Sequence, residues 1–211
     1  MSLVIDAHTH IGLKHGLSQS ADELIAKLDQ AGVDKAVMFP FPEGNGLTGD
    51  VRANNDVVTQ AVKAHGDRVI PFCIVNPWHK ELAVKELRYC VEELGFKGLK
   101  IHPTLHGYRL SDHGLVDPLF EAAADLGITI TSHGAGDLLN NPSEFAEMAR
   151  TFPTVPLLMV HMGVFWSTDH AVEVAKKYPN VYLDTSRAPI FEIQVAVKEV
   201  GPEQVIWGTD A

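Results

Sequence analysis

Val4-Ile5-Asp6-Ala7-His8-Thr9-His10 is a short apolar run that ends in two histidines one residue apart. Alternate side chains of a strand share a face, so Asp6, His8 and His10 are expected to point the same way. Two imidazoles on one face at the end of a strand can bind a cation. The His-x-His pattern alone describes two surface histidines beside a turn equally well, so its interpretation depends on the rest of the chain.

Apolar runs of strand length recur along the chain, with amphipathic segments of helix length between them. Most of the runs are continuously apolar, which is typical of buried parallel strands. After the opening stretch, strands are predicted over residues 35–39, 69–75, 98–102, 128–133, 156–161, 181–184 and 204–207. Ser20 is predicted to open a helix, with Glu23 as its capping-box partner, and another helix is predicted to begin at Asn141-Pro142. Further helices are predicted over 51–64, 81–94, 118–126 and 189–200, and one capped by Ser167 or Thr168 is predicted to run to about residue 177. Residues 40–50, rich in proline and glycine, are predicted to form a loop.

This alternation predicts parallel βα units, and eight of them indicate a closed (β/α)8 TIM barrel rather than an open doubly wound sheet. The turn after the first strand does not have the glycine pattern of a dinucleotide fold. The 211 residues, 45% of them hydrophobic, are ample for one domain over 1–211. The sequence ends one residue after Asp210, so we expect the eighth helix to be missing, the seam beside the first strand to be bare, and Asp210 to be poorly fixed. An open seam favours a homo-oligomer.

Composition excludes several classes of partner. The formal net charge of −10 argues against nucleic acid and against anionic membranes. We see no apolar run of membrane-spanning length and no basic, apolar signal segment. Cys73 and Cys90 lie in apolar patterns and are expected to be reduced core thiols, which indicates a cytoplasmic protein.

Chemistry in a barrel of this type gathers at the carboxyl ends of the strands. The first, fifth, sixth and eighth predicted strands end in, or shortly before, a histidine or aspartate of interest, and the fourth carries lysine and histidine two residues apart. The residues concerned are His8, His10, Lys100, His102, His133, His161 and Asp210. One such histidine is usually a satisfied polar group, but the set as a whole predicts a shared site. Imidazole and carboxylate together suit zinc, manganese or iron.

A metal with one open position lowers the pKa of the water it binds. Asp210 could accept a proton from that water while also contacting the metal. His161 could be a further ligand, or a base or charge stabiliser beside the metal. Arg187, after the seventh strand, could pair with a substrate carboxylate or form a structural salt bridge. Phe165 and Trp166 could wall the pocket or cover the barrel rim.

The ordered set of His-x-His, a fourth-strand lysine, a fifth-strand histidine, His-x-Gly and Gly-Thr-Asp resembles the amidohydrolase superfamily over the whole chain. Residues 5–10, 98–103 and 161–163 look most similar to its aminocarboxymuconate-semialdehyde decarboxylase-like branch. The resemblance implies one divalent metal held by His8, His10, His133 and Asp210. Zinc is the expected ion, with manganese and iron as alternatives. In that branch the sixth-strand histidine, here His161, serves in catalysis and not as a primary ligand.

Lys100 separates two versions of the site. In other branches of the superfamily a fourth-strand lysine is carboxylated and bridges two metals, the second of which would here bind His133 and His161. Otherwise Lys100 remains an ammonium in the barrel mouth, paired with a carboxylate such as Asp6 or Asp210. The flanking residues favour one metal. The residues expected to face the substrate are then Lys100, Arg187 and His102, although His102 could instead stand behind the metal ligands.

The predicted activity is hydrolysis of a small-molecule amide, ester or lactone by metal-activated water. His161 would stabilise the developing charge and Asp210 would move the proton. The alternative is a metal-dependent decarboxylase, a lyase, of a small unsaturated or aromatic acid, in which His161 serves protonation and loss of carbon dioxide. Arg187 suits an acidic substrate in both and does not decide between them. A third hypothesis is a binding protein that keeps the fold without turnover.

Overall fold

The computed structural model describes residues 3–14, 17–41, 51–134, 136–164 and 167–211. Its strands form a 9-stranded sheet in the order β2-β1-β3-β4-β5-β6-β7-β8-β9. The strands are β1 (Ile5–Lys14), β2 (Leu17–Gln19), β3 (Lys35–Pro40), β4 (Val69–Ile74), β5 (Gly98–Ile101), β6 (Thr129–Ser132), β7 (Leu157–Met159), β8 (Val181–Asp184) and β9 (Val205–Ile206). Every neighbouring pair is parallel except β1 and β2, which form an antiparallel hairpin.

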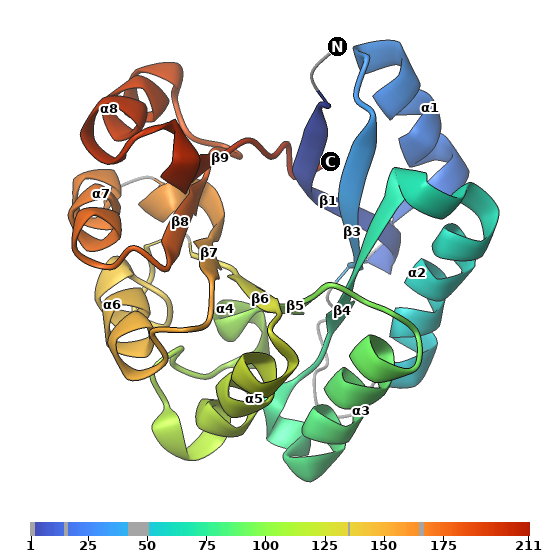
Figure 1. Cartoon of the computed structure of the whole chain (residues 1–211), viewed down its shortest axis with the longest axis horizontal. Coiled ribbons are helices and arrows are strands. Elements are labelled where there is room, and N and C mark those ends of the chain that lie inside the picture. Colours follow the sequence, from blue (N-terminus) through green and yellow to red (C-terminus); the bar gives the residue numbers. More distant parts are fainter. Residues whose placement is uncertain (1–2, 15–16, 42–50, 135, 165–166) are drawn as a thin grey trace.

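The helices of the described residues lie outside the ring of strands (Figure 1). They are α1 (Ala21–Ala31), α2 (Val51–His65), α3 (Glu81–Glu92), α4 (Pro103–His106), α5 (His113–Leu126), α6 (Pro142–Thr151), α7 (Thr168–Lys177) and α8 (Ile190–Val200). The single-turn helix α4 aside, one helix follows each barrel strand from β1 to β8. The predicted (β/α)8 barrel is therefore confirmed.

The segment after β9 runs beside β1, where the C-terminus lies in Figure 1. Backbone hydrogen bonds connect Ala7 N–H to the Trp207 carbonyl (3.1 Å) and Asp210 N–H to the His8 carbonyl (2.8 Å). A third joins His10 N–H to the Ala211 carbonyl (2.7 Å). The first and last strands of the barrel are thus bridged by main chain. Self-association at this seam stays a prediction.

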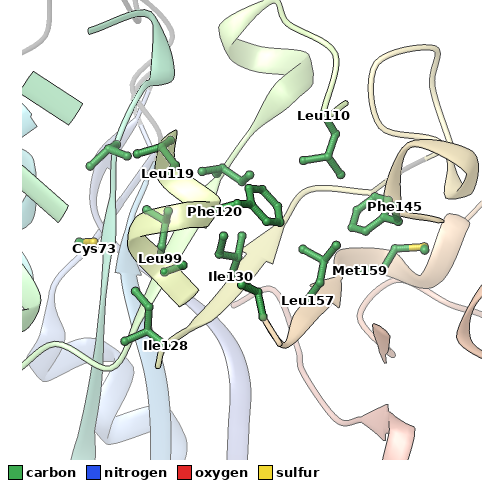
Figure 2. Packing of buried hydrophobic residues seen from close by; sticks show 14 of the residues in the cluster. Cys73, Leu99, Leu110, Leu119, Phe120, Ile128, Ile130, Phe145, Leu157 and Met159 are labelled. Atoms are coloured by element: carbon green, nitrogen blue, oxygen red, sulfur yellow. The ribbon is translucent and has the colours of Figure 1, made fainter. Parts of the chain in front are cut away.

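Alternate strand residues divide the core into an outer and an inner part. Figure 2 shows Leu99, Ile130 and Leu157, from β5, β6 and β7, in one layer with Phe120 of α5 and Phe145 of α6. Apolar residues on this outer face bury the sheet against the helices, which is the dominant favourable contribution to folding.

The inner face of the sheet carries a second, smaller apolar cluster of Val37, Phe39 and Phe72. Phe39 is the parallel neighbour of His10, so this cluster shares the face on which the histidines lie. The barrel interior is therefore apolar in one part and polar at the carboxyl ends of the strands.

Local signals predicted most element starts correctly. Ser20 and Glu23 form the expected capping box, and the Asn141 side chain caps α6. The expected start of a helix at Pro118 is wrong, because α5 begins five residues earlier at His113 and contains that proline. Neither β2 nor α4 was predicted, since three or four residues are too few for a periodic pattern.

Three further sequence predictions have different outcomes. The loop expected over 40–50 falls almost entirely outside the described residues. Cys73 and Cys90 are buried free thiols, as expected. None of the described helices is both long enough and apolar enough to cross a membrane.

Candidate metal centre

The predicted site residues meet at the carboxyl ends of the barrel strands. They come from β1 (His8, His10), from β5 (Lys100) and from the segments after β5, β6, β7, β8 and β9 (His102, His133, His161, Arg187, Asp210). The ring centroids of His8 and His161 are 5.5 Å apart. His133 lies 5.1 Å from His161 and 4.0 Å from His102 by the same measure. Segments distant in sequence therefore build one cluster of imidazoles, in which His8 and His161 are buried and His102 and His133 are half-buried.

Three metal-type donor atoms converge within this cluster. His8 Nε2 lies 3.3 Å from His10 Nε2, and Asp210 Oδ1 lies 3.1 Å and 3.3 Å from these two nitrogens. Both histidines are buried, and the Asp210 side chain is 13% exposed. These residues form one of the candidate cation-binding groups among the described residues.

The hydrogen-bond partners of the two imidazole rings leave an arrangement that fits a cation. His8 Nδ1 lies 2.8 Å from Asp184 Oδ2, and His10 Nδ1 lies 3.4 Å from the carbonyl oxygen of Pro40. Both Nδ1 atoms face acceptors, so with a cation between the Nε2 atoms each neutral ring can carry its proton on Nδ1 and turn a lone pair inward; without a cation, the Asp210 carboxylate can accept hydrogen bonds from the same Nε2 atoms. Two such lone pairs and the Asp210 carboxylate meet at 3.1–3.3 Å, which is a donor set suited to a divalent metal.

Asp210 is held firmly, contrary to the expectation from its place near the end of the sequence. Its backbone is in the left-handed region (φ 62°) and its N–H donates to the His8 carbonyl. Arg187 Nε donates to Asp210 Oδ2 at 2.6 Å. Burial by itself raises the pKa of Asp210, but the imidazoles of His10 and His8 and the Arg187 guanidinium favour the ionised form and hold that pKa well below its ordinary value.

The segment before Asp210 is fixed by Asp6, whose role sequence reasoning left open. Thr209 donates to Asp6 through its N–H (3.1 Å to Oδ1) and its hydroxyl (2.6 Å to Oδ2). Asp6 Oδ1 also accepts the His8 N–H at 3.1 Å. One buried carboxylate therefore connects β1, which carries the two histidines, to the segment that carries Asp210.

His133 lies beside the three-residue group but is not part of it: the group formed by described residues contains His8, His10 and Asp210. The His133 ring stacks on the His102 ring at an interplanar angle of 15°. Burial, and secondly the charge of Lys100, lowers the pKa of His133 to about 2, so the ring is neutral and its lone pair is available. His133 as a ligand stays a prediction.

Lys100 is a buried cation on the inner face of the barrel. Its side chain is almost completely buried, and Nζ lies 4.7 Å from the centroid of the Phe39 ring. Burial lowers the pKa of His10 to about 4; contact with Asp210 opposes that shift and Lys100 adds to it. A positive charge near histidines keeps them neutral, which is the state that binds metals.

His161 is placed in a tight turn after β7 and not in the strand itself. Its backbone has a φ of 64°, a left-handed conformation that is costly for a residue with a side chain. His161 Nδ1 lies 2.8 Å from Ser186 Oγ and 3.3 Å from the Ser186 carbonyl oxygen. The ring is thereby fixed from one side, with Nε2 on the other.

Two residues that contact these histidines were missed by sequence reasoning. Asp184 is fully buried and contacts His8, and Ser186 contacts both His8 and His161. Asp184 ends β8, so the strand-end rule that selected the other residues would also have found it. Ser186 lies two residues beyond the strand and gives no comparable signal. Phe165 and Trp166 lie outside the described residues.

Comparisons with known proteins identify the family of this chain. Residues 5–211 match the model of a family described as Amidohydrolase. Gamma-resorcylate decarboxylase of Polaromonas sp. (strain JS666 / ATCC BAA-500) is 22% identical over 258 residues, which cover 94% of this chain and 78% of that protein. The 2-amino-3-carboxymuconate-6-semialdehyde decarboxylase of Dictyostelium discoideum is 33% identical over 79 residues, which cover 37% of this chain and 22% of that protein.

A solved structure shares the fold. The dihydroxybenzoic acid decarboxylase from Polaromonas sp. JS666, solved with bound manganese and the inhibitor 2-nitroresorcinol, superposes with a TM-score of 0.73. It is 17% identical in sequence, and the match covers 100% of this chain and 86% of that one.

These similarities correct the sequence-based expectation of a hydrolase. The named relatives and the solved structure are decarboxylases, so the primary prediction of amide, ester or lactone hydrolysis is wrong and its alternative agrees with them. The physical reason is that a histidine and aspartate metal site serves either reaction. Such a site can activate water or bind the oxygens of an acidic substrate, and the ligand residues do not distinguish the two.

Proposed function

The chain belongs to the amidohydrolase family, and on that premise we propose that it is a metal-dependent decarboxylase of a small aromatic or unsaturated carboxylic acid. The observation that carries the proposal is the convergence of His8 Nε2, His10 Nε2 and Asp210 Oδ1 within 3.3 Å of one another. The decarboxylases similar to this chain support the choice of reaction.

We propose that His8, His10 and Asp210 hold one divalent ion, with His133 as a further ligand. Manganese is supported by the decarboxylase solved with that metal, and zinc suits the same ligand types. Bound there, the ion would supply a Lewis acid for the carboxylate and phenolate oxygens of the substrate.

Decarboxylation breaks the bond between the carboxylate carbon and the substrate carbon, and the electron pair stays on the latter. That carbon then needs a proton, while carbon dioxide leaves. We propose that His161 takes a proton from solvent at Nε2 and passes it to this carbon, because Nδ1 is engaged by Ser186. A positioned proton donor of this kind contributes about 10²–10⁴-fold to a rate.

Three cationic or donor groups would recognise an acidic substrate. His102 Nδ1 accepts the Leu105 N–H at 3.2 Å, so neutral His102 carries its proton on Nε2 and is a donor there. Lys100 adds a buried ammonium. Arg187 is 62% exposed and contacts Asp210 through Nε, and its two terminal nitrogens carry four more N–H donors that could bind a carboxylate.

The test is a decarboxylation assay on protein loaded with manganese or with zinc. The panel contains 2,6-dihydroxybenzoate, other hydroxybenzoates and aminocarboxymuconate semialdehyde, with carbon dioxide release as the readout. We expect turnover of at least one acid, inhibition by 2-nitroresorcinol, and a loss of about 10²–10⁴-fold in His161→Ala.

The matched control is His170→Ala, which removes an exposed histidine on α7 and should retain full activity. An absence of carbon dioxide release from every acid, by protein that has bound its metal, would overturn the proposal.

A further inference from the structure

Asp184 is a buried carboxylate at the end of β8 that contacts two histidines of the site by different routes. Its Oδ2 atom lies 2.8 Å from His8 Nδ1, in direct contact. The Ser186 hydroxyl donates to the same oxygen, and Ser186 Oγ lies 2.8 Å from His161 Nδ1. A continuous hydrogen-bonded path therefore runs from His161 through Ser186 and Asp184 to His8.

The direction of every proton in this path follows from the chemistry of its members. An ionised carboxylate only accepts hydrogen bonds. Asp184 has this acceptor role, because the N–H groups of His161 and Ser186 and the Ser186 hydroxyl all donate to its two oxygens. The single hydroxyl proton of Ser186 is directed to Asp184, so Ser186 Oγ can only accept from His161. The Ser186 carbonyl, 3.3 Å from His161 Nδ1, is also only an acceptor.

Asp184 also holds the backbone around both partners. Its Oδ2 accepts the His161 N–H at 3.3 Å, and its Oδ1 accepts the Ser186 N–H at 3.1 Å. His161 adopts the left-handed conformation at this point, so the carboxylate supports a costly backbone geometry as well as the ring.

We propose that Asp184 sets the ring tautomers of His8 and His161 together, directly for the first and through Ser186 for the second, so that both rings present an Nε2 lone pair to the site. Asp184 and Ser186 are positioning residues in this scheme, because they act through the histidines. The value of these tautomers for catalysis rests on the proposed function, whereas the tautomers themselves do not.

His8, His161 and Asp184 are also a candidate cation-binding group, and a second metal there is the competing interpretation. The hydrogen bonds argue against it. His8 Nδ1 and Asp184 are joined at hydrogen-bond distance, and the Ser186 hydroxyl connects Asp184 to His161. A metal bound to this group would have to displace the protons that these contacts share.

The first experiment needs no substrate, and it uses variants only to assign the signals. Long-range ¹⁵N–¹H correlation spectra of histidine-labelled protein loaded with diamagnetic zinc distinguish Nδ1–H from Nε2–H tautomers, with assignment by His8→Gln and His161→Gln. We expect both rings as the Nδ1–H form. An Nε2–H tautomer at either ring would overturn the proposal, whatever the enzyme assay gives.

The second experiment separates the direct route from the relayed one by titrating manganese into three variants and following heat of binding. Asp184→Asn weakens the acceptor for His8, and we expect affinity to fall by about 10–100-fold, as for other partners of metal-bound histidines. Ser186→Ala retains the contact between Asp184 and His8, so its affinity should stay close to that of the wild type, while the Nδ1–H signal of His161 weakens. Asp67→Asn is the matched control, because that carboxylate is 88% exposed.

Equal affinity in Asp184→Asn and the control would overturn the direct route, and an unchanged His161 spectrum in Ser186→Ala would overturn the relay. Two metal ions per chain in the wild type, falling to one in Asp184→Asn, would replace the proposal by a second metal site.

Discussion

Asp184 and Glu86 are both buried carboxylates with several hydrogen-bond donors around them, but they lie in different layers of the barrel. Glu86, on α3, accepts from the Arg52 guanidinium at 2.6–3.0 Å and from Asn55 Nδ2 at 3.2 Å. Asp184, inside the barrel mouth, accepts from His8 and Ser186. Burial and a hydrogen-bonded carboxylate are therefore common to a structural and to a candidate functional network.

The difference between the two networks is where the partners' remaining groups point. Asn55 also bonds to both backbone groups of Ile74, and the Arg52 guanidinium lies 3.7 Å from the centroid of the Tyr89 ring. Those contacts join α2, β4 and α3 and end within the fold. The histidines held by Asp184 instead present their other nitrogens to a site where acceptor atoms converge. A buried carboxylate thus indicates a function only when its partners also present polar atoms to a site outside the network.

The largest effect should come from removing one of the converging donors. In His10→Ala, one imidazole of the three-atom group is lost. Metal affinity should therefore fall by more than about 10–100-fold, the loss expected when a residue that only contacts a metal ligand is changed. Ligand binding stabilises a native state in proportion to the logarithm of ligand concentration over Kd. Manganese should therefore raise the Tm of the wild type and of His170→Ala but not that of His10→Ala. An equal rise in all three proteins would show that the metal binds elsewhere.

The next largest effect should separate the two carboxylates by their consequences for the metal. Asp184→Asn should weaken manganese binding by about 10–100-fold, because the ring of His8 loses its ionised partner. Glu86→Gln should leave the affinity unchanged, because its network ends at α2, β4 and α3. Both proteins are measured by the same titration. Weakened manganese binding in Glu86→Gln would mean that the helical layer and the barrel mouth are coupled. The Glu86 network would then not be purely structural.

Sequence reasoning found the barrel and most of the site because both depend on local patterns. Apolar runs gave the strands, and residues at strand ends gave the histidines, Lys100 and Asp210. Ser186 could not be found this way, since its role depends on the distance between β7 and β8 turns that only the folded chain brings together. The Glu86 network was invisible for a similar reason: Arg52 is 34 residues away in sequence, and neither residue interrupts its helical pattern.

The choice of reaction could not be read from the site residues at all. A histidine and aspartate set predicts a metal, and the metal's chemistry depends on which substrate atoms reach it. Lys100, His102 and Arg187 favour an acid, but an acidic substrate suits hydrolysis and decarboxylation equally. Only the similarity to named decarboxylases favoured one of the two.

A smaller effect is expected on stability, where Glu86→Gln should differ from the wild type although its metal affinity does not. Removing this charge weakens hydrogen bonds from Arg52 and Asn55, and such bonds to charged groups contribute about 1.5–3 kcal/mol. The free energy of unfolding, measured with urea in metal-free protein, should fall by about that amount. The exposed control Asp67→Asn should stay close to the wild type. A Glu86→Gln protein as stable as the control would show that the Glu86 network does not stabilise the fold.

The smallest effect is the change with pH in the stability difference between the wild type and Glu86→Gln. This change cannot exceed the stability difference itself. Burial alone raises the pKa of Glu86, but the hydrogen bonds from Arg52 and Asn55 lower it overall, so the folded value lies below the unfolded one. A group with a depressed folded pKa stabilises the protein fully above its unfolded pKa, about 4.3 for glutamate, and loses that contribution as the pH falls through the folded value. The stability gap between wild type and Glu86→Gln should therefore be constant from pH 8 to about pH 5 and should close below about pH 4. Asp184 titrates in both proteins and cancels in the subtraction. If the stability gap persists unchanged in acid, the charge of Glu86 is not its cause. Protonated Glu86 would then stabilise the protein relative to the Glu86→Gln variant as much as ionised Glu86 does, which would point to shape and packing.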